Sequence, residues 1–250
     1  MSKAVIAVRT ILFYAAVVAA LVLFVPAMSL LFLRDRAPAL RFYRLYLRIL
    51  RLLLRWIVGI EDRVEGLENL PPAPYLLASR HESAWEVMFY PLFFDDPAAF
   101  AKQEIFDYPL GGRIARVAGH IAIDRTGDLA ALKAAFEGAR QTVAAGRSVL
   151  IFPSGTRYPE GRDRIQRGVV ALYELLNVPC VPVVLDSGRC WPPNDWLKYP
   201  GRIRVRVGAA IPPGLEREAF LAALRGGLGL PSPSDVPTAD RRRAPEPAAP

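Results

Sequence analysis

A histidine and a glutamate five residues apart, His81 and Glu86, are the residues of this sequence best suited to proton transfer. They belong to the run 79–86, SRHESAWE, which follows a short apolar segment, 75–78, typical of a buried strand. α/β proteins build their sites at the ends of such strands. A neutral imidazole can take a proton from an alcohol, and a nearby carboxylate can fix its tautomer and stabilise the imidazolium. The pair therefore predicts general-base chemistry, for which His120 is the chain's only other histidine.

The same run also fits a structural role. Residues 83–86, SAWE, match the capping box S-x-x-E, in which serine and glutamate side chains satisfy backbone donors at the start of a helix. In that interpretation Glu86 caps a helix extending to about Phe94, and His81 is an ordinary loop residue. This segment alone leaves both interpretations open.

Three later segments place polar residues directly after apolar runs. They are 119–125 (GHIAIDR), 152–157 (FPSGTR) and 181–188 (VPVVLDSG). Glycine lets a backbone approach a ligand closely, and the planar guanidinium of arginine suits phosphate. Arg125 and Arg157 therefore predict binding of an anionic substrate group. Arg164 and Arg167 lie close enough in sequence to join them.

The composition favours a membrane partner. The chain of 250 residues suffices for one domain with an appendage, and it is 52% hydrophobic with a net charge of +8. A basic, apolar protein can meet nucleic acid or an anionic membrane surface, and the apolar excess favours the membrane. We expect no nucleic-acid partner, because no nucleic-acid-binding motif accompanies the charge. Cys180 and Cys190 have neither metal-ligand nor disulfide spacing, and we expect no metal site.

Residues 10–33 form an uncharged segment between Arg9 and Arg34 that is long enough to cross a bilayer core. The arginines that follow it predict that its C-terminal side lies in the cytoplasm. Because basic residues flank both ends, a helix that dips into one leaflet remains the alternative.

Residues 40–57 predict a second, amphipathic helix. Its arginines recur at helical spacing and form one stripe: Arg41, Arg44, Arg48, Arg51 and Arg55. A basic stripe opposite leucines and aromatic residues is typical of a helix lying in an anionic membrane interface. The alternative is the solvated face of a core helix. We therefore predict that residues 1–60 are a membrane-anchoring region.

Between residues 61 and 226, strand-like and helix-like segments alternate. This pattern predicts an α/β domain with a mixed sheet flanked by helices. The expected strands are 75–79, 98–101, 120–124, 148–152, 180–185 and 202–207, and the expected helices are 85–94, 129–145, 169–176 and 216–224. Strict alternation in 202–207, RIRVRV, predicts a strand with one solvated face at a sheet edge. The Gly-, Pro-, Ser- and Ala-rich residues 227–250 predict a disordered tail.

The order of these motifs resembles the bacterial glycerolipid acyltransferases, specifically the 1-acylglycerol-3-phosphate acyltransferases. That family carries His-x4-Asp, Gly-x-Ile-x-Ile-x-Arg, Phe-Pro-Glu-Gly-Thr-Arg and a Val-Pro-Val strand, which this chain resembles from about Tyr75 to Ser187. Residues 102–105, KQEI, are similar to the family's Lys-x-Glu-Leu step. Four motifs in this order, behind a membrane-binding N-terminus, make the resemblance specific.

The resemblance implies an enzyme of phospholipid biosynthesis at the bacterial inner membrane, with its catalytic domain facing the cytoplasm. It would move an acyl group from acyl-CoA or acyl-carrier protein to the free hydroxyl of lysophosphatidic acid, giving phosphatidic acid without a cofactor. His81 would be the general base and Glu86 would orient it. Backbone donors near Gly155 would stabilise the oxyanion. The implied substrate-binding residues are Lys102, Arg125, Ser154, Gly155, Thr156, Arg157 and Arg167.

Two positions depart from the family pattern. Glu86 replaces the usual aspartate, and its longer side chain is still expected to reach His81. Ser154 replaces the glutamate that helps to bind the acceptor, and Glu160 is a nearby carboxylate that does not match the motif. The acceptor therefore stays open between lysophosphatidic acid and another lysolipid, such as a lyso-aminolipid. A catalytically silent lipid-binding protein is the third alternative.

Overall fold

The computed structural model describes residues 1–31, 36–108, 111–124, 128–159, 161 and 163–231. Within them the helices are α1 (Lys3–Leu31), α2 (Arg36–Leu53), α3 (Trp85–Phe89), α4 (Gln103–Asp107), α5 (Gly111–Val117), α6 (Leu129–Ala144), α7 (Arg167–Leu176) and α8 (Arg217–Gly227). The strands are β1 (Ile60–Glu65), β2 (Leu76–Ser79), β3 (Ala98–Lys102), β4 (Ile121–Ile123), β5 (Val149–Ile151), β6 (Cys180–Leu185) and β7 (Gly201–Val207). A π-helical turn, Leu54–Val58, connects α2 to β1.

These strands form one seven-stranded sheet in the order β1-β7-β6-β2-β5-β3-β4. Neighbouring strands are parallel except for the antiparallel pair β6–β7, so the predicted mixed α/β sheet is confirmed. In the centre, Leu77 of β2 lies beside Val181 of β6 and Leu150 of β5. The carboxyl ends of β6, β2 and β5 therefore meet at one edge of the sheet.

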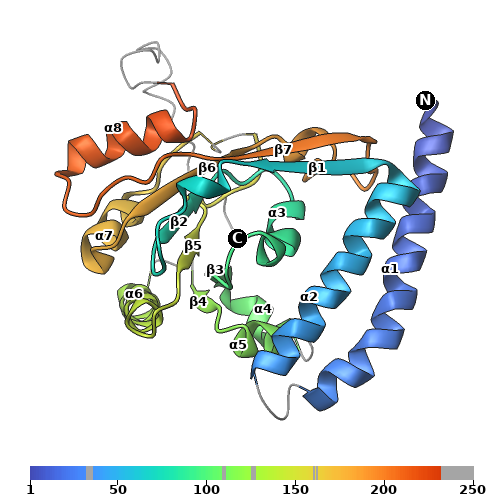
Figure 1. Cartoon of the computed structure of the whole chain (residues 1–250), viewed down its shortest axis with the longest axis horizontal. Helices are drawn as coiled ribbons and strands as arrows, with labels where there is room; N and C mark the ends of the chain where they lie inside the picture. The colour runs from blue at the N-terminus through green and yellow to red at the C-terminus, as the bar shows by residue number, and fades with distance from the viewer. Residues whose placement is uncertain (32–35, 109–110, 125–127, 160, 162, 232–250) are drawn as a thin grey trace.

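Alternation along the strands builds a separate core on each face of the sheet. Leu77 packs in a cluster with Leu50 of α2 and Trp85 of α3. Its neighbour Leu76 packs in the opposite cluster with Leu172 of α7. Figure 1 shows this layering, with α1, α2 and α3 on one side and α6, α7 and α8 on the other.

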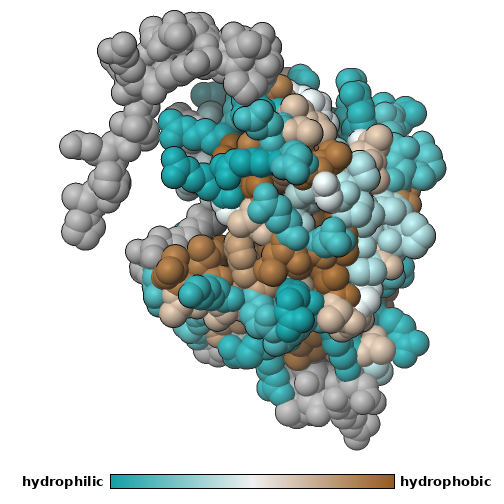
Figure 2. Space-filling model, turned by 90° about the vertical axis from the view of Figure 1, so that its left-hand side faces the viewer, coloured by the Kyte–Doolittle hydropathy of each residue, from teal (hydrophilic) through white to brown (hydrophobic). Residues whose placement is uncertain are grey.

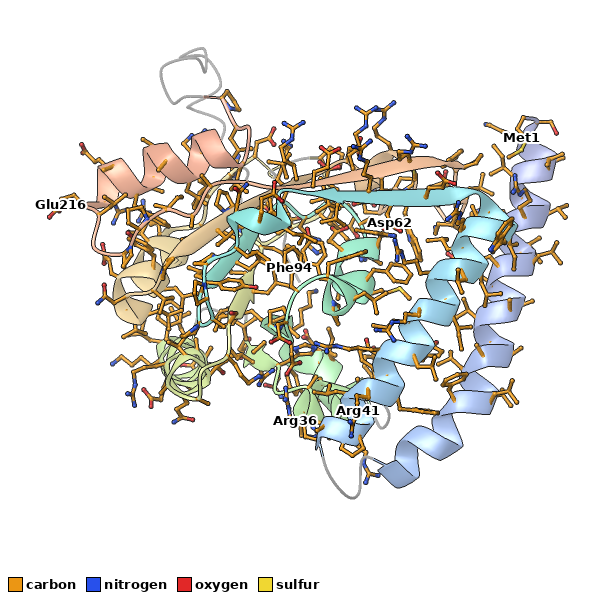
Figure 3. The ribbon with its side chains drawn as sticks, in the orientation of Figure 1. Met1, Arg36, Arg41, Asp62, Phe94 and Glu216 are labelled. Atoms are coloured by element: carbon orange, nitrogen blue, oxygen red, sulfur yellow. The ribbon has the colours of Figure 1, made fainter. Side chains whose placement is uncertain are left out.

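The strand β1 was missed from the sequence. It carries charges at most positions, and the Asp62 side chain, 6% exposed, is bound by Arg51 of α2 with two 2.7 Å hydrogen bonds. Figure 3 shows Asp62 beside α2. Since β1 pairs with β7, the prediction that 202–207 is an edge strand is wrong. Its solvated face is confirmed, because the arginines of β7 are exposed and alternate with buried residues.

α1 and α2 form an antiparallel pair, with Met1 and Arg36 at opposite ends (Figure 3). The predicted arginine stripe of α2 is divided between two surroundings. Arg51 and Arg44 turn toward the α/β domain, where they pair with Asp62 and Asp95. Exposed residues of α2 and the turn that follows it include arginines and apolar side chains, namely Arg41, Leu45, Arg48, Leu52, Arg55 and Trp56, and of these Arg55 also pairs with Glu61 of β1. Only this part of the stripe fits an interfacial helix.

The exposed side chains of α1 are largely apolar and include Val8, Leu12 and Leu23. In contrast, the face of the molecule opposite α1 carries many hydrophilic side chains around its hydrophobic ones (Figure 2). At the other end of the chain, Leu228 and Leu230 are buried in the core, so ordered packing continues past the expected start of the tail at 227. Residues 232–250 lie outside the described part of the chain.

Candidate active site

Loops that follow the three central strands converge at the carboxyl edge of the sheet. His81 follows β2, Phe152 follows β5 and Ser187 follows β6. These strands are neighbours in the order β6-β2-β5, and they run parallel. Residues far apart in the sequence therefore reach one place because the sheet brings their strands together.

His81 and Glu86 are in direct contact. The Nδ1 atom of His81 lies 2.8 Å from Oε1 of Glu86. The histidine side chain is 16% exposed, whereas that of Glu86 is fully buried. The short loop between β2 and α3 places the carboxylate on the first turn of α3, facing back toward the imidazole. The predicted pair is thus assembled, and glutamate reaches as expected.

The Glu86 carboxylate is surrounded by hydrogen-bond donors. Its Oε1 atom accepts from His81 and from the backbone N–H groups of Glu82 and Ser83, both at 2.7 Å. Its Oε2 atom accepts from the hydroxyl of Ser83 at 3.0 Å and from that of Ser187 at 2.7 Å. Every donor favours the ionised carboxylate.

These contacts favour the ionised form of Glu86 and one tautomer of His81. Burial alone would raise the pKa of Glu86, but hydrogen bonds from His81, Ser83 and Ser187 outweigh it and hold this pKa below its ordinary value. An ionised carboxylate only accepts, so Nδ1 of His81 carries the hydrogen. In the neutral imidazole this leaves Nε2 with a free lone pair, which is the state that a general base requires.

The run 83–86 makes the local bonds of a capping motif, although α3 ends at Phe89 and not near Phe94. Glu86 accepts from the Ser83 N–H, and the Ser83 hydroxyl accepts from the Trp85 N–H at 2.9 Å, so the local bonds of a capping motif are present. The same glutamate oxygen that caps the turn also binds His81. The cap therefore fixes the carboxylate that orients the imidazole.

A second contact holds the imidazole from the side of β5. The rings of His81 and Phe152 stack with centroids 4.1 Å apart and an angle of 18° between their planes. The aromatic ring thus restricts rotation of the histidine side chain while leaving its edge available to a substrate.

The residues after Phe152 form a tight turn. The hydroxyl of Ser154, a buried residue, donates to the Thr156 carbonyl at 2.7 Å, and Gly155 has a φ of +68° that favours glycine. The Gly155 N–H donates to the Phe152 carbonyl at 2.9 Å. This N–H is therefore occupied within the turn, and the expected oxyanion donors near Gly155 remain a prediction.

The remaining predicted residues are spread around this edge. Arg157 ends the turn and is partly exposed, Arg167 is exposed on the first turn of α7, and Lys102 is exposed at the end of β3. None of the three forms an ion pair with another described residue. Arg125 and Glu160 lie outside the described residues.

Ser187 is the site residue that the sequence did not reveal. It lies in the predicted strand-and-turn segment 181–188, and its hydroxyl reaches Glu86 across 101 positions of sequence. The available signal was its position directly after a buried strand. The strand order that puts β6 beside β2 was needed to read that signal.

The described residues contain no group of His, Cys, Asp and Glu side chains that could hold a metal ion. What the site can do follows from the dyad: remove a proton from a hydroxyl and return it to a leaving group.

Comparisons with known proteins agree with this chemistry. The model of the family described as Acyltransferase matches residues 62–186. The 1-acyl-sn-glycerol-3-phosphate acyltransferase of Pseudomonas aeruginosa is 35% identical over 210 residues, which cover 82% of this chain and 81% of the relative. The chain belongs to the acyltransferase family. A mouse relative, 1-acyl-sn-glycerol-3-phosphate acyltransferase alpha, is 32% identical, with 67% of this chain and 60% of the relative covered.

A solved structure extends the likeness to the fold of almost the whole acyltransferase. The 1-acyl-sn-glycerophosphate (LPA) acyltransferase of Thermotoga maritima superposes with a TM-score of 0.71 and 21% identity, and 91% of this chain and 96% of that chain are covered. The family match contains His81, Glu86 and the turn after β5, and it ends just before Ser187.

Proposed function

We propose that this acyltransferase moves an acyl group from a thioester, acyl-CoA or acyl-carrier protein, to the free hydroxyl of 1-acylglycerol 3-phosphate, giving phosphatidic acid. The observation that carries the proposal is the His81–Glu86 pair, with Nδ1 held by an ionised carboxylate and Nε2 directed away from it. The relatives named for this reaction support the choice of substrate.

The reaction follows from the protonation state of the dyad. Nε2 of His81 takes the proton of the acceptor hydroxyl while the hydroxyl oxygen forms a bond to the thioester carbonyl carbon. The tetrahedral intermediate collapses, the carbon–sulfur bond breaks, and the imidazolium returns its proton to the departing thiolate. Glu86 stabilises the imidazolium between these steps.

Transfer is direct, without an acyl-enzyme on cysteine. Burial raises the pKa of the Cys180 thiol to about 12 and also raises the pKa of Cys190. Both residues are buried. Neither thiol has the thiolate character of a nucleophile.

Arg157 is the described residue best placed to bind the acceptor phosphate. It ends the turn that begins at Phe152, which stacks on His81, and its guanidinium forms no ion pair with a described side chain. A planar guanidinium suits a phosphate through paired hydrogen bonds. Arg125 and Arg167 are proposed to add positive charge for binding the same phosphate.

The helix α1 is proposed to insert into one leaflet. By length and composition, Lys3–Phe24 could cross a membrane. Only 17% of its most apolar window is buried by protein, which leaves most of its apolar surface for lipid. Near its start, Arg9 donates to the Ile57 carbonyl and Thr10 accepts from Lys198 at 3.1 Å. A spanning helix would carry these residues to the far side of the bilayer, away from their partners. We propose that the catalytic domain faces the cytoplasm at the bacterial inner membrane, because arginines follow the apolar segment of α1.

Product analysis tests this function. Purified protein in detergent would receive an acyl-CoA or an acyl-carrier protein with lysophosphatidic acid, or with a panel of lysolipids that lack the phosphomonoester. Phosphatidic acid as the main product is expected. Acylation of a lyso-aminolipid alone would show that Ser154 marks a changed acceptor site, and no product with any pair would favour a silent lipid-binding protein.

A further inference from the structure

The segment between β6 and β7 touches both the dyad and the membrane helix. We call residues 187–199 the bridging loop. It begins with Ser187, a fully buried residue whose hydroxyl donates to Oε2 of Glu86 at 2.7 Å. Its ends are tied together because the Tyr199 N–H donates to the Cys190 carbonyl at 2.8 Å.

The far side of the bridging loop packs against α1. The Lys198 backbone N–H donates to the hydroxyl of Thr10 at 3.1 Å, and Thr10 is 0% exposed. The Trp191 ring packs edge-on against Phe13, with centroids 6.1 Å apart. The same loop is therefore anchored at one end on Glu86 and at the other on α1.

The Lys198 side chain stiffens this loop from within. Lys198 is 2% exposed, and its ammonium donates to the carbonyls of Asp195, Trp196 and Leu197 at 3.0, 2.9 and 3.2 Å. It also lies over the Trp191 ring, 5.1 Å from the centroid. A buried charge costs much free energy unless it is satisfied, and here the loop's own carbonyls satisfy it. The loop is thus able to transmit the position of α1 to Ser187.

We propose that the bridging loop couples the seating of α1 to the catalytic dyad, with Ser187 as a positioning residue for Glu86 and Thr10 as the contact that holds the loop. This inference rests on the proposed roles of His81 and Glu86. Oε2 of Glu86 accepts from Ser83, which is local, and from Ser187, which arrives from a distant part of the chain. Ser187 therefore connects the dyad to the rest of the fold.

The consequence for catalysis is a change in proton affinity. Without the Ser187 donor, the negative charge on Oε2 is less compensated, and the dyad holds the imidazolium proton to higher pH. The titratable groups around this carboxylate are His81, Glu82 and Tyr90. The acidic limb of the kcat/KM profile follows protonation of the essential base, so it reports the change.

The experiment compares Ser187→Ala and Ser187→Thr in the full chain in detergent. Ser187→Ala is expected to lower kcat roughly tenfold with little change in acceptor KM. It should also move the acidic limb to higher pH, and Ser187→Thr should restore both. Ser148→Ala is the matched control, because Ser148 is equally buried but precedes β5 at the opposite edge of the sheet. Ser148→Ala should lower the unfolding temperature without moving the acidic limb of the kcat/KM profile.

Thr10 variants test the coupling to α1 and remain informative if Ser187→Ala does not fold. Thr10→Val is expected to lower kcat and move the limb in the same direction, whereas Thr10→Ser should resemble wild type. In the double variant with Ser187→Ala, Thr10→Val should cause little further loss of kcat, because both substitutions act through the same chain of contacts. Effects that multiply in the double variant would overturn the coupling.

Two further results separate this inference from the proposed function. If His81→Ala is inactive while Ser187→Ala has the kcat and pH profile of wild type, the positioning role is overturned and the dyad stands. A Ser187→Ala variant that behaves like Ser148→Ala would likewise reduce Ser187 to a structural residue. An active His81→Ala variant would overturn the proposed function itself.

Discussion

Phe152 lies flat against the imidazole of His81, with ring centroids 4.1 Å apart. The first residue of the turn after β5 therefore holds the proposed general base, which follows β2. The two motifs are separated in sequence but act as one unit, because their strands are neighbours in the sheet.

Replacing Phe152 by leucine should loosen the imidazole without emptying the core. We expect kcat to fall about two- to tenfold, which corresponds to the loss of one aromatic contact, with acceptor KM unchanged. Steady-state kinetics of Phe152→Leu and Phe152→Tyr provide the check, since tyrosine keeps the stacked ring. Equal losses in both variants would show that stacking on His81 is not what Phe152 contributes.

Glu86→Asp should lose activity although the family motif usually carries aspartate. The donors around Glu86 are placed for the longer side chain, at 2.7 to 3.0 Å from its oxygens. Withdrawing the carboxylate by one methylene misplaces the imidazole, and a shift of about 1 Å can cost roughly a hundredfold in rate. Glu86→Gln should cost roughly 10³- to 10⁴-fold, because an amide does not replace the charge. An aspartate variant with wild-type kcat would contradict this geometry.

Arg157→Ala should weaken acceptor binding more than chemistry. Loss of one guanidinium–phosphate contact should raise the acceptor KM roughly tenfold or more, with kcat changed much less. Arg63→Ala is the control, since Arg63 lies in β1 at the outer edge of the sheet. If the acceptor KM of Arg157→Ala matches that of Arg63→Ala, Arg157 does not bind the phosphate.

His120 should make the folded protein less stable as the solution is acidified. Burial and the charge of Arg147 lower the pKa of His120 from 6.5 to about 4, and Nδ1 accepts from the Ala99 N–H at 3.1 Å. Between these values the unfolded chain binds a proton that the folded protein does not. The free energy of unfolding therefore falls as pH decreases from about 6.5 to 4, by on the order of 3 kcal/mol at most.

Denaturant unfolding at several pH values measures this effect. His120→Asn keeps an acceptor for Ala99 but has no titrating ring, so its stability should vary less with pH over this window. Glu86 and the other carboxylates remain in both proteins, so the difference between the two curves isolates His120. Parallel curves for wild type and His120→Asn would contradict the assignment.

The apolar face of α1 should govern membrane binding. Replacing Val8, Leu12 and Leu23 by serine removes exposed apolar surface without touching Thr10 or Phe13. We expect the triple variant to shift from the membrane pellet toward the soluble fraction, whereas Leu129→Ser with Leu175→Ser on α6 and α7 should not. Substitution is a cleaner test than deletion of 1–36, which would uncover the core around Phe13. An unchanged distribution would show that α2 is the main anchor.

Much of the geometry of the candidate site was predictable because its determinants are local. His81, Glu86 and the turn after β5 each follow an apolar run, and the order of the runs indicated the sheet. Ser187 required knowledge of strand order, since its bond to Glu86 spans 101 positions.

Charge obscured the other missed features. β1 does not resemble a buried strand because most of its residues are charged. The charge of Asp62 is tolerated because Arg51 compensates it, and only the tertiary fold supplies that partner. For the same reason, arginines that looked like one membrane-facing stripe on α2 serve two surfaces. The edge position predicted for β7 was wrong because the strand that covers its edge had not been recognised.

The most direct test is the rate of phosphatidic acid formation by wild type and His81→Ala, purified in the same detergent and given the same acyl thioester and lysophosphatidic acid. The dyad predicts rapid formation by wild type and a loss of roughly 10²- to 10⁴-fold or more in the variant, with its fold intact by circular dichroism. A folded His81→Ala protein that forms phosphatidic acid at the wild-type rate would contradict the account.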